Sequence, residues 1–567
     1  MRNFLYCLMG FFLLSCTVNA VTVDQDAIEK EVRIKAGVLQ DNLIIQDQNR
    51  RRYEESLRDA RKKQSIPIDY GAPATASVIL GELPSFNITD IELKGATFLA
   101  DFEKITLVSP YLNRMITIND INQLAASVTD AYLKKGYVTT RTYLPKQSLK
   151  SGHLILEVHE GFIADIRLEG ITSLQKDLAF FSVQRRPLNI WSLEQAMDQL
   201  NRLSSIQAVM QLSPAQDTGG TVVTVRNMGG RLGSASVRYD TVSDSQVQVI
   251  PTSVDLGYDN MLGTLDQWTV SYFQKFKDNT QYQNNLSCSV SQPMGSVTGR
   301  VAFSQFDYMT LVAGTNKNLI TSGESITAKG SLDVMLFRAA KDKLVGTVEL
   351  TNKSNQNFIE DTKIDTNSSS LTTLSLGLNN LWYADFGTMG LDLRYIRGLS
   401  STMDSPTLDV GSAHQQFDKF TAEITLTLPI STAWFPVTLQ GRLMGQYSPV
   451  ALYASERLSI GDSYSTPGYE MAFSGDSGAQ ASLKLMYTPG FLGQNIGFYH
   501  GIYGGVVSKA GQWNDVGGHA IMTSIATGIT YRDDVWSMDI TLAKAVKASS
   551  GLEIPGAQCF WTLTRSF

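Results

Sequence analysis

The residues from about Leu232 to Phe567 form a long series of short segments in which apolar and polar side chains alternate. Such alternation is typical of β-strands, because successive side chains on a strand point to opposite faces. A water-soluble β-sandwich would show the same pattern, so alternation alone leaves the fold open. The clearest segments are Ile326–Val334, Phe420–Leu428, Ile521–Tyr531 and Trp536–Leu542.

The number and length of these segments decide between the two folds. About sixteen segments of 8 to 12 residues can be placed, and the last one ends at Phe567. Strands of this length cross an outer membrane when they are tilted. An even number of antiparallel strands in a closed ring satisfies every backbone N–H and C=O group in lipid. The sequence therefore predicts a transmembrane β-barrel over residues 229–567, with Phe567 as its carboxyl-terminal signal for barrel assembly.

Composition agrees with an exported barrel and excludes several other classes of protein. The net charge is -6 and the mean hydropathy is -0.08, so there is neither a basic face for nucleic acid nor a helical membrane domain. Residues 1–20 are typical of a secretory signal peptide, with Val18–Ala20 as the cleavage site. A lipoprotein processing site at Leu13–Cys16 is the alternative. The expected location is the outer membrane of a Gram-negative cell.

Residues 21–63 are rich in charged and amide side chains and predict a polar helical segment, of which residues 47–63 are the later part. Two interpretations stay open. The segment is either a solvated leader or a helix that lies in a polar barrel lumen, where a helix polar on all sides fits. Residues 64–85 contain several Pro and Gly residues and predict a linker.

A compact α/β unit is predicted over residues 86–162. One strand runs over 86–95 and a first helix over 101–112. A second helix begins at Thr117 with a capping box to Asp120 and ends at Gly136. Strands over 137–144 and 153–159 complete the unit. The apolar stripe of the second helix consists of Ile121, Leu124, Val128 and Tyr132.

The order then repeats more loosely over residues 163–228. A strand over 163–170 is followed by a helix that opens at Ser192 and by strands over 208–212 and 221–226. Two copies of a strand–helix–helix–strand–strand unit are therefore expected in front of the barrel.

The stretch from Gly136 to Gly161 resembles the first POTRA (polypeptide-transport-associated) domain of two-partner secretion transporters, the TpsB or ShlB–FhaC–HecB family. Its motif positions are Gly136, Tyr137, Arg141, Pro145, Gln147, Gly152 and Gly161. Two further matches lie in the barrel, at Ser234–Asp240 with Asp259–Trp268, and at Ser455–Gly461 with Thr466–Tyr469 and Phe473–Gly478. The resemblance covers nearly the whole mature chain and makes residues 86–162 POTRA 1 and residues 163–228 POTRA 2.

The resemblance implies a mechanism of type V secretion. Periplasmic POTRA domains bind the amino-terminal secretion domain of a large exoprotein, which is a cytolysin, an adhesin or a contact-dependent toxin. The exoprotein then crosses the barrel unfolded, without ATP at this membrane. In this family residues 47–63 correspond to a helix that plugs the barrel. Outer-membrane lipid and the barrel-assembly machinery are the other implied partners, and an outer-membrane assembly factor is the alternative function.

One departure from the family pattern concerns the inward-folding loop, residues 447–479. The family's tip motif carries an arginine that pairs with an aspartate on a barrel strand. Here the tip is Thr466, Pro467, Gly468 and Tyr469, and the strand counterpart is Tyr503 to Gly505, so both charges are replaced. Losing both partners together costs less than stranding one charge. We expect the loop to stay in the lumen, held by Tyr469, by packing against Tyr503, or by another contact. The alternative is a looser loop with different gating.

No enzyme chemistry is expected. The five histidines lack metal-ligand spacing, and the Gly-Asp-Ser stretches at 461–463 and 475–477 lack the strand–helix elbow of a serine hydrolase. We expect no catalytic residues, no cofactor, no metal and no nucleic-acid partner. Cys288 and Cys559 fall on the fourth and last predicted strands, so a disulfide between them is not expected.

Overall fold

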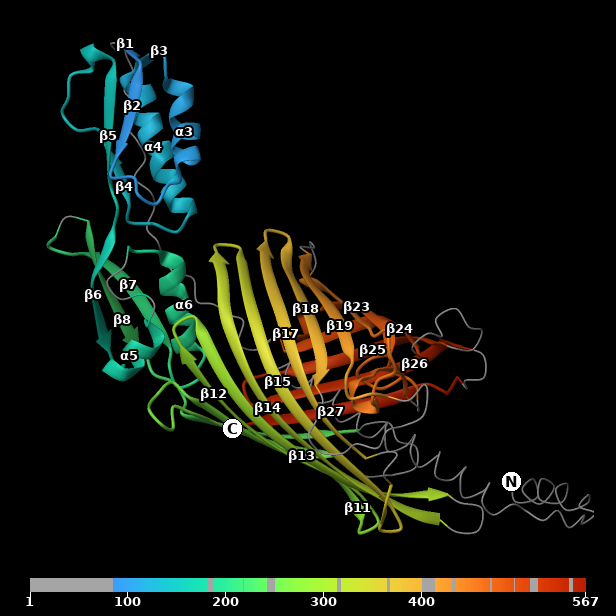
Figure 1. Ribbon diagram of the computed structural model, residues 1–567. Coiled ribbons are helices and arrows are strands. Elements are labelled where there is room, and N and C mark those ends of the chain that lie inside the picture. The colour runs from blue at the N-terminus through green and yellow to red at the C-terminus, as the bar shows by residue number, and fades with distance from the viewer. Residues whose placement is uncertain are drawn as a thin grey trace, which may run out of the picture.

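The computed structural model describes residues 85–567, apart from 182, 184–186, 218, 242–249, 314–317, 365–367, 400–412, 431–434, 470–471, 494, 510–518 and 550–553. Two small α/β units stand beside a closed barrel (Figure 1). The predicted signal peptide, the helical segment over 21–63 and nearly all of the linker lie outside the described residues. Within the described part, no helix is both long and apolar enough to cross a membrane.

POTRA 1 is built on a three-stranded sheet in the order β2-β5-β4, with β2 parallel to β5. A separate pair, β1 with β3, lies beside it. Helix α4 begins after Thr117, which forms the predicted capping box with Asp120, and its predicted apolar stripe is fully buried. The elements are β1 (Ser85–Ile88), β2 (Asp90–Lys94), α3 (Asp101–Val108), η1 (Ser109–Tyr111), β3 (Arg114–Thr117), α4 (Ile118–Lys134), β4 (Arg141–Tyr143), η2 (Leu149–Ser151) and β5 (His153–His159).

Three predicted elements of POTRA 1 are wrong in their extent. The single strand over 86–95 is two strands, because the backbone N–H groups of Thr89 and Asp90 donate to the Gly152 carbonyl and the pairing partner changes there. The strand over 137–144 is only Arg141–Tyr143, since a backbone hydrogen bond from Thr140 to Tyr137 forms a turn first. The first helix stops at Val108, before a 3₁₀ turn that contains Pro110.

POTRA 2 has the expected order of strand, two helices and two strands. Its elements are β6 (Phe162–Glu169), α5 (Ser173–Ala179), α6 (Ile190–Asn201), β7 (Ala208–Pro214) and β8 (Gly220–Asn227), and the sheet order is β6-β8-β7. Helix α6 begins two residues before the predicted Ser192, because the Asn189 side chain accepts a hydrogen bond from Trp191 N and caps the helix there.

The barrel contains sixteen antiparallel strands and is closed by the pairing of β27 with β9. The predicted strand number and fold class are therefore confirmed. The first eight strands are β9 (Gly233–Asp240), β10 (Thr252–Asp259), β11 (Gln267–Asp278), β12 (Gln281–Met294), β13 (Val297–Ala313), β14 (Asn318–Ala339), β15 (Asp342–Ile359) and β17 (Ser369–Ala384). The last eight are β18 (Gly387–Leu399), β19 (Asp418–Ile430), β20 (Val437–Tyr447), β23 (Ser477–Tyr487), β24 (Ile496–Ser508), β25 (His519–Arg532), β26 (Trp536–Ala548) and β27 (Gln558–Ser566). A two-residue segment, β16 (Thr362–Lys363), extends β15 only.

The two ends of the barrel differ. The end that carries the POTRA domains has short turns, such as 295–296 between β12 and β13 and 385–386 between β17 and β18. The opposite end has longer connections, such as 448–476 between β20 and β23. Short periplasmic turns and long extracellular loops are typical of outer-membrane barrels, so the POTRA end is the periplasmic one.

Candidate functional site

The connection between β20 and β23 folds into the barrel and forms the centre of the candidate site. It contains a 3₁₀ turn, η4 (Ala454–Glu456), and a short hairpin of β21 (Leu458–Ile460) with β22 (Phe473–Gly475). Leu458, Ile460 and Tyr469 are buried in one apolar cluster with side chains from strands β20, β24, β25 and β26. We call residues 448–476 the inward loop.

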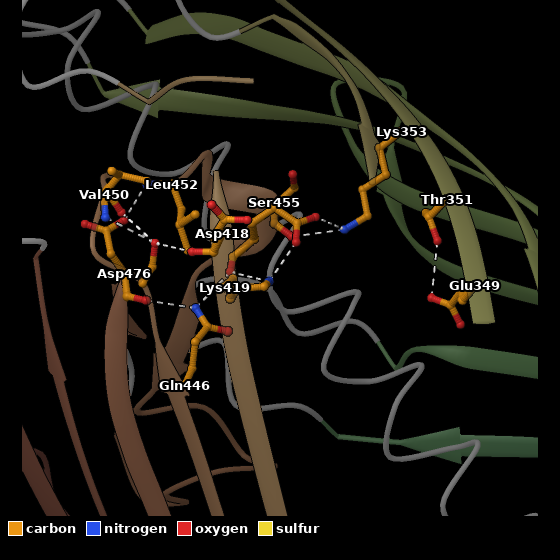
Figure 2. Close-up of polar contacts among 12 residues, drawn as sticks. Glu349, Thr351, Lys353, Asp418, Lys419, Gln446, Val450, Leu452, Ser455 and Asp476 are labelled. Atoms are coloured by element: carbon orange, nitrogen blue, oxygen red, sulfur yellow. Dashed lines mark hydrogen bonds and ion pairs between the residues drawn. The ribbon is translucent and has the colours of Figure 1, made fainter. Parts of the chain in front are cut away.

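The base of the inward loop is held by a buried ion triad. Glu456 accepts hydrogen bonds from the ammonium groups of Lys353 on β15 and of Lys419 on β19, the latter at 2.7 Å. The Glu456 and Lys419 side chains are only 5% and 4% exposed. Figure 2 shows Lys353 and Lys419 approaching the segment around Ser455 from two different strands. The triad therefore joins the loop to both strands through the lumen.

Electrostatics keep this carboxylate charged. Burial alone would raise the pKa of Glu456, but the two ammonium groups outweigh burial and hold that pKa well below its usual range. Lys353 and Lys419 also donate to the carbonyls of Ser455 and Glu456. Their remaining donors are thus partly satisfied by loop backbone.

A second set of contacts shapes the loop itself. The Asp476 carboxylate accepts from Leu452 N at 2.8 Å and from Arg457 Nε at 3.2 Å. The Gln446 amide of β20 donates to the carbonyls of Glu456 and Asp476. These bonds tie both ends of the loop together next to the strand from which it departs.

The predicted tip residues reach the wall formed by β25 and β26. The Tyr469 hydroxyl lies 2.8 Å from the Thr523 carbonyl oxygen and 2.5 Å from the Lys547 carbonyl oxygen. Gly468 has a φ of +102°, and a Cβ there would lie 2.9 Å from Ala545 N. Pro467 and Thr466 are buried next to them, and the Thr466 hydroxyl accepts from the Gly461 backbone N–H, which closes the tip turn.

The two predicted contact residues on β24 have different surroundings. Gly505 faces Ile460 so closely that a Cβ at Gly505 would collide with its side chain. The Tyr503 ring lies under the ammonium group of Lys484, 5.7 Å from its centroid, and the Tyr469 hydroxyl bonds to β25 and β26 instead. The structure therefore brings Gly505 and the loop together, and it places the Tyr503 ring against Lys484 of β23.

The motif residues of POTRA 1 lie in its framework. The Gln147 amide donates to the Ile155 carbonyl at 2.6 Å and accepts from Ile155 N at 2.9 Å, so it continues the sheet beyond β4. The Pro145 carbonyl lies 3.4 Å from the same amide nitrogen. The Tyr137 ring stacks on Phe98 with centroids 4.8 Å apart.

The motif glycines and Arg141 fix tight backbone turns. Gly136 has a φ of +90°, and a Cβ there would lie 2.5 Å from Trp191 Nε1 of POTRA 2. Gly152 has a φ of +78°, and Gly161 packs directly on a threonine side chain. The Arg141 guanidinium donates to two backbone carbonyls of its own turn. The motif therefore preserves the shape of POTRA 1 and its joint with POTRA 2.

POTRA 2 is fixed to the periplasmic turns of the barrel by a charged cluster. The Arg338 guanidinium, 7% exposed, binds Asp198 at 2.6 Å and Glu194 at 3.3 Å on α6, and Lys343 binds Asp198 at 2.9 Å. Burial alone would raise the pKa of Asp198, but Arg338 and Lys343 outweigh it and hold that pKa below its ordinary value. Leu265, from the turn between β10 and β11, is buried in the POTRA 2 core.

Sequence reasoning did not identify the ion triad or this cluster. Glu456 lies within the family match at Ser455–Gly461, but no sequence pattern marks it as the partner of Lys353 and Lys419. The one sequence feature that could have pointed to these lysines is a charged side chain on the lumen-facing side of an alternating strand, and many lumen residues share that feature. At the other end of the chain, the Phe567 backbone N–H donates to the Ala235 carbonyl on β9 and helps to close the barrel.

Comparisons with known proteins agree with this architecture. Residues 219–531 match the family described as haemolysin secretion/activation protein ShlB/FhaC/HecB, residues 86–161 match the ShlB-type POTRA domain, and residues 162–214 match a POTRA domain. The outer membrane transporter CdiB of Dickeya dadantii is 28% identical over 432 residues, which are 75% of this chain and 76% of that protein.

Two further relatives extend the comparison. The hemolysin transporter protein ShlB of Serratia marcescens is 25% identical over 474 residues, which are 78% of this chain and 82% of that protein. The solved structure of CdiB from Escherichia coli matches with a TM-score of 0.83 at 25% identity and covers 93% of this chain and 99% of that one. The chain therefore belongs to the ShlB/FhaC/HecB family of haemolysin secretion/activation proteins and is an outer-membrane transporter with periplasmic POTRA domains.

Proposed function

We propose that the POTRA domains bind the amino-terminal secretion domain of a large exoprotein and deliver it, unfolded, to the barrel lumen. The arrangement that supports this route is a closed sixteen-stranded barrel whose lumen holds a loop fixed by reversible polar contacts. No nucleotide is used at this membrane, so binding and folding of the exoprotein outside drive the movement. The exoprotein is a cytolysin, an adhesin or a contact-dependent toxin.

We further propose that the inward loop leaves its position during transport. The triad at Glu456 and the Tyr469 contact fix the loop at two places, and both consist of hydrogen bonds and ion pairs that water can replace. An exoprotein segment that enters the lumen brings its own polar backbone groups and water. Movement of the loop then opens the path for the exoprotein. The other proposed partners are outer-membrane lipid, which surrounds the barrel, and the barrel-assembly machinery, which inserts it.

An exposed apolar pair on POTRA 1 suggests where the exoprotein is bound. Phe102 and Ile105 lie three residues apart on α3 and are 71% and 64% exposed. Residues at this spacing share one face of a helix, and apolar groups gathered on a surface mark interaction sites. We include this face of α3 in the recognition surface.

The test is a comparison of culture supernatants by mass spectrometry, from cells with the gene, without it, and with F102S/I105S. The deletion should remove one large protein from the medium, and the double variant should reduce its secretion with normal barrel abundance. F386S, in an exposed periplasmic turn of the barrel, is the matched control and should secrete normally. An unchanged supernatant with a general fall of outer-membrane barrels would instead assign the chain to barrel assembly.

A further inference from the structure

The outward face of strands β20 and β23–β26 contains a hollow of about 530 Å³. The lining of this hollow is mostly apolar. Because side chains along each strand alternate between the lipid and the lumen, its position on the strands places it on the lipid side. On β23, Leu483 and Leu485 are about 40% exposed, whereas Lys484 between them lies over the lumen rings of Tyr499 and Tyr503. The apolar lining side chains are Leu439, Leu483, Leu485, Ile502, Ile525 and Leu542.

Three polar residues also line this hollow, and two of them satisfy each other. The His500 ring nitrogens lie 3.0 Å from the Thr527 hydroxyl and 3.3 Å from the Tyr487 hydroxyl. The His500 ring also stacks on Tyr487. Both of its nitrogens therefore have partners on neighbouring strands, and His500 needs no ligand.

Lys544 is the third polar residue, and its ammonium group has no such partner. Its side chain is exposed on the same face as Leu542, two residues earlier on β26. Among the residues that the structure describes, none forms a hydrogen bond or an ion pair with the Lys544 ammonium. Buried or lipid-exposed charges are normally paired, so a lysine in an apolar, lipid-facing hollow calls for an anion.

The position of Lys544 along β26 indicates which lipid layer it meets. The strand runs from Trp536 at the periplasmic end to Ala548, so Lys544 lies four residues before the extracellular end. At 3.3 Å per residue and a tilt near 45°, this depth is about 9 Å below the end of the strand. The ammonium group therefore lies on the outer-leaflet side, within reach of lipid head groups.

We propose that this hollow binds an anionic, phosphate-bearing lipid of the outer leaflet, with its acyl chains along the leucine and isoleucine side chains and a phosphate on Lys544. The volume lies within the ~300–1,000 Å³ of ordinary small-molecule sites. Basic side chains beside an apolar membrane surface are the common means of binding acidic lipid head groups. The site is separate from the lumen and does not depend on the exoprotein.

The position of this lipid site relates it to the inward loop. Gly468 at the loop tip packs against the backbone of Lys544 and Ala545 from the lumen side. The Tyr469 hydroxyl bonds to the Lys547 carbonyl three residues further along the same strand. A lipid held on the outer side of β26 would therefore stabilise the part of the wall on which the loop tip rests.

Native mass spectrometry of the full-length protein, titrated with lipid A, tests the proposal. The comparison lipids are dephosphorylated lipid A and zwitterionic phosphatidylethanolamine. Loss of one charge-assisted contact corresponds to about a tenfold loss of affinity, which we expect for Lys544→Gln with lipid A only. Lys544→Arg should keep most of the affinity. Arg565→Gln is the matched control, because Arg565 is a cation near the periplasmic end of β27 that lies over Trp536.

Each other outcome counts against the site. Equal affinity of Lys544→Gln and the wild type means that the lysine extends to the aqueous layer alone. Equal binding of phosphorylated and dephosphorylated lipid A means that the hollow takes acyl chains only. An equal loss in Arg565→Gln assigns binding to general surface charge. If Lys544→Gln does not insert, Lys544→Arg decides, and failure of Lys544→Arg to bind while it is folded overturns the proposal.

Discussion

Glu456 is the residue at which most of the polar contacts of the inward loop meet. Its carboxylate binds two lysines from β15 and β19, and its carbonyl accepts from Gln446 and from Lys419. Two ammonium groups face one carboxylate, so the cluster carries a net positive charge. The acid of this triad belongs to the loop, and both cations belong to barrel strands.

Glu456→Gln should loosen the loop. The substitution leaves Lys353 and Lys419 facing a neutral amide within the lumen, and breaking a buried ion pair costs about 3–5 kcal/mol. The loop should then leave its position more often, which planar-bilayer recordings detect as more frequent or larger openings. Asp385→Asn removes a carboxylate from an ion pair with Lys341 that is 90% and 62% exposed, and it should leave the recordings unchanged. Identical recordings for Glu456→Gln and the wild type would show that the triad does not hold the loop.

At the scale of elements, the tip of the inward loop and strand β26 are fitted to each other through a glycine. Gly468→Ala adds a Cβ that would lie 2.9 Å from Ala545 N at a residue with a φ of +102°. Backbone strain of this kind costs about 1–3 kcal/mol, so the tip should move away from β26 and become accessible to added protease. Gly490→Ala meets no atom within 4 Å and is the control. Equal protection of both variants would contradict this account of the tip.

The joint between the two POTRA domains depends on another glycine. Gly136→Ala would place a Cβ 2.5 Å from the Trp191 indole, so POTRA 1 should shift against POTRA 2. Spin labels on the two domains should then report a broader distance distribution, and secretion should fall. Gly229→Ala is a close control, because Gly229 has the same φ of +90° but no atom within 4 Å of its Cβ position. If both variants behave alike, backbone strain rather than contact with Trp191 explains the effect.

At the scale of the whole molecule, the Arg338 cluster fixes POTRA 2 to the barrel and should make this junction sensitive to acid. The pKa of Asp198 is lowered in the folded protein, so its contribution is complete above the ordinary carboxyl pKa and is lost as the pH falls through the lower folded value. Spin labels on POTRA 2 and on the barrel should keep a narrow distance distribution down to about pH 4 and broaden below it. For Asp198→Asn, the distance distribution should be broad already at pH 7, because the ion pairs with Arg338 and Lys343 are lost. A wild-type distance distribution that stays narrow until the whole protein unfolds in acid would contradict this prediction.

Some features of the fold follow directly from the order of residues. The strand number and the capped helix α4 could be predicted from the sequence, because each rests on a local period or on a local cap. The inward fold of the loop was expected only from the resemblance to the family. The break in the strand over 86–95 could not be predicted, since it depends on a contact of Thr89 with the carbonyl of Gly152, more than sixty residues away. The same holds for the short β4, where the turn at Thr140 competes with strand propensity.

The barrel and the two α/β units in front of it can be inferred from the order of residues, because strand alternation, helix caps and glycine turns act between near neighbours. Which charged side chains pair with each other depends on the three-dimensional fold. Lys353, Lys419 and Glu456 come from three distant segments, and Arg338 and Asp198 come from two. The sequence pattern around a lumen-facing lysine does not show whether its ammonium group contacts water, a loop or another strand. Its partner is set by barrel closure and by the path of the inward loop through the lumen.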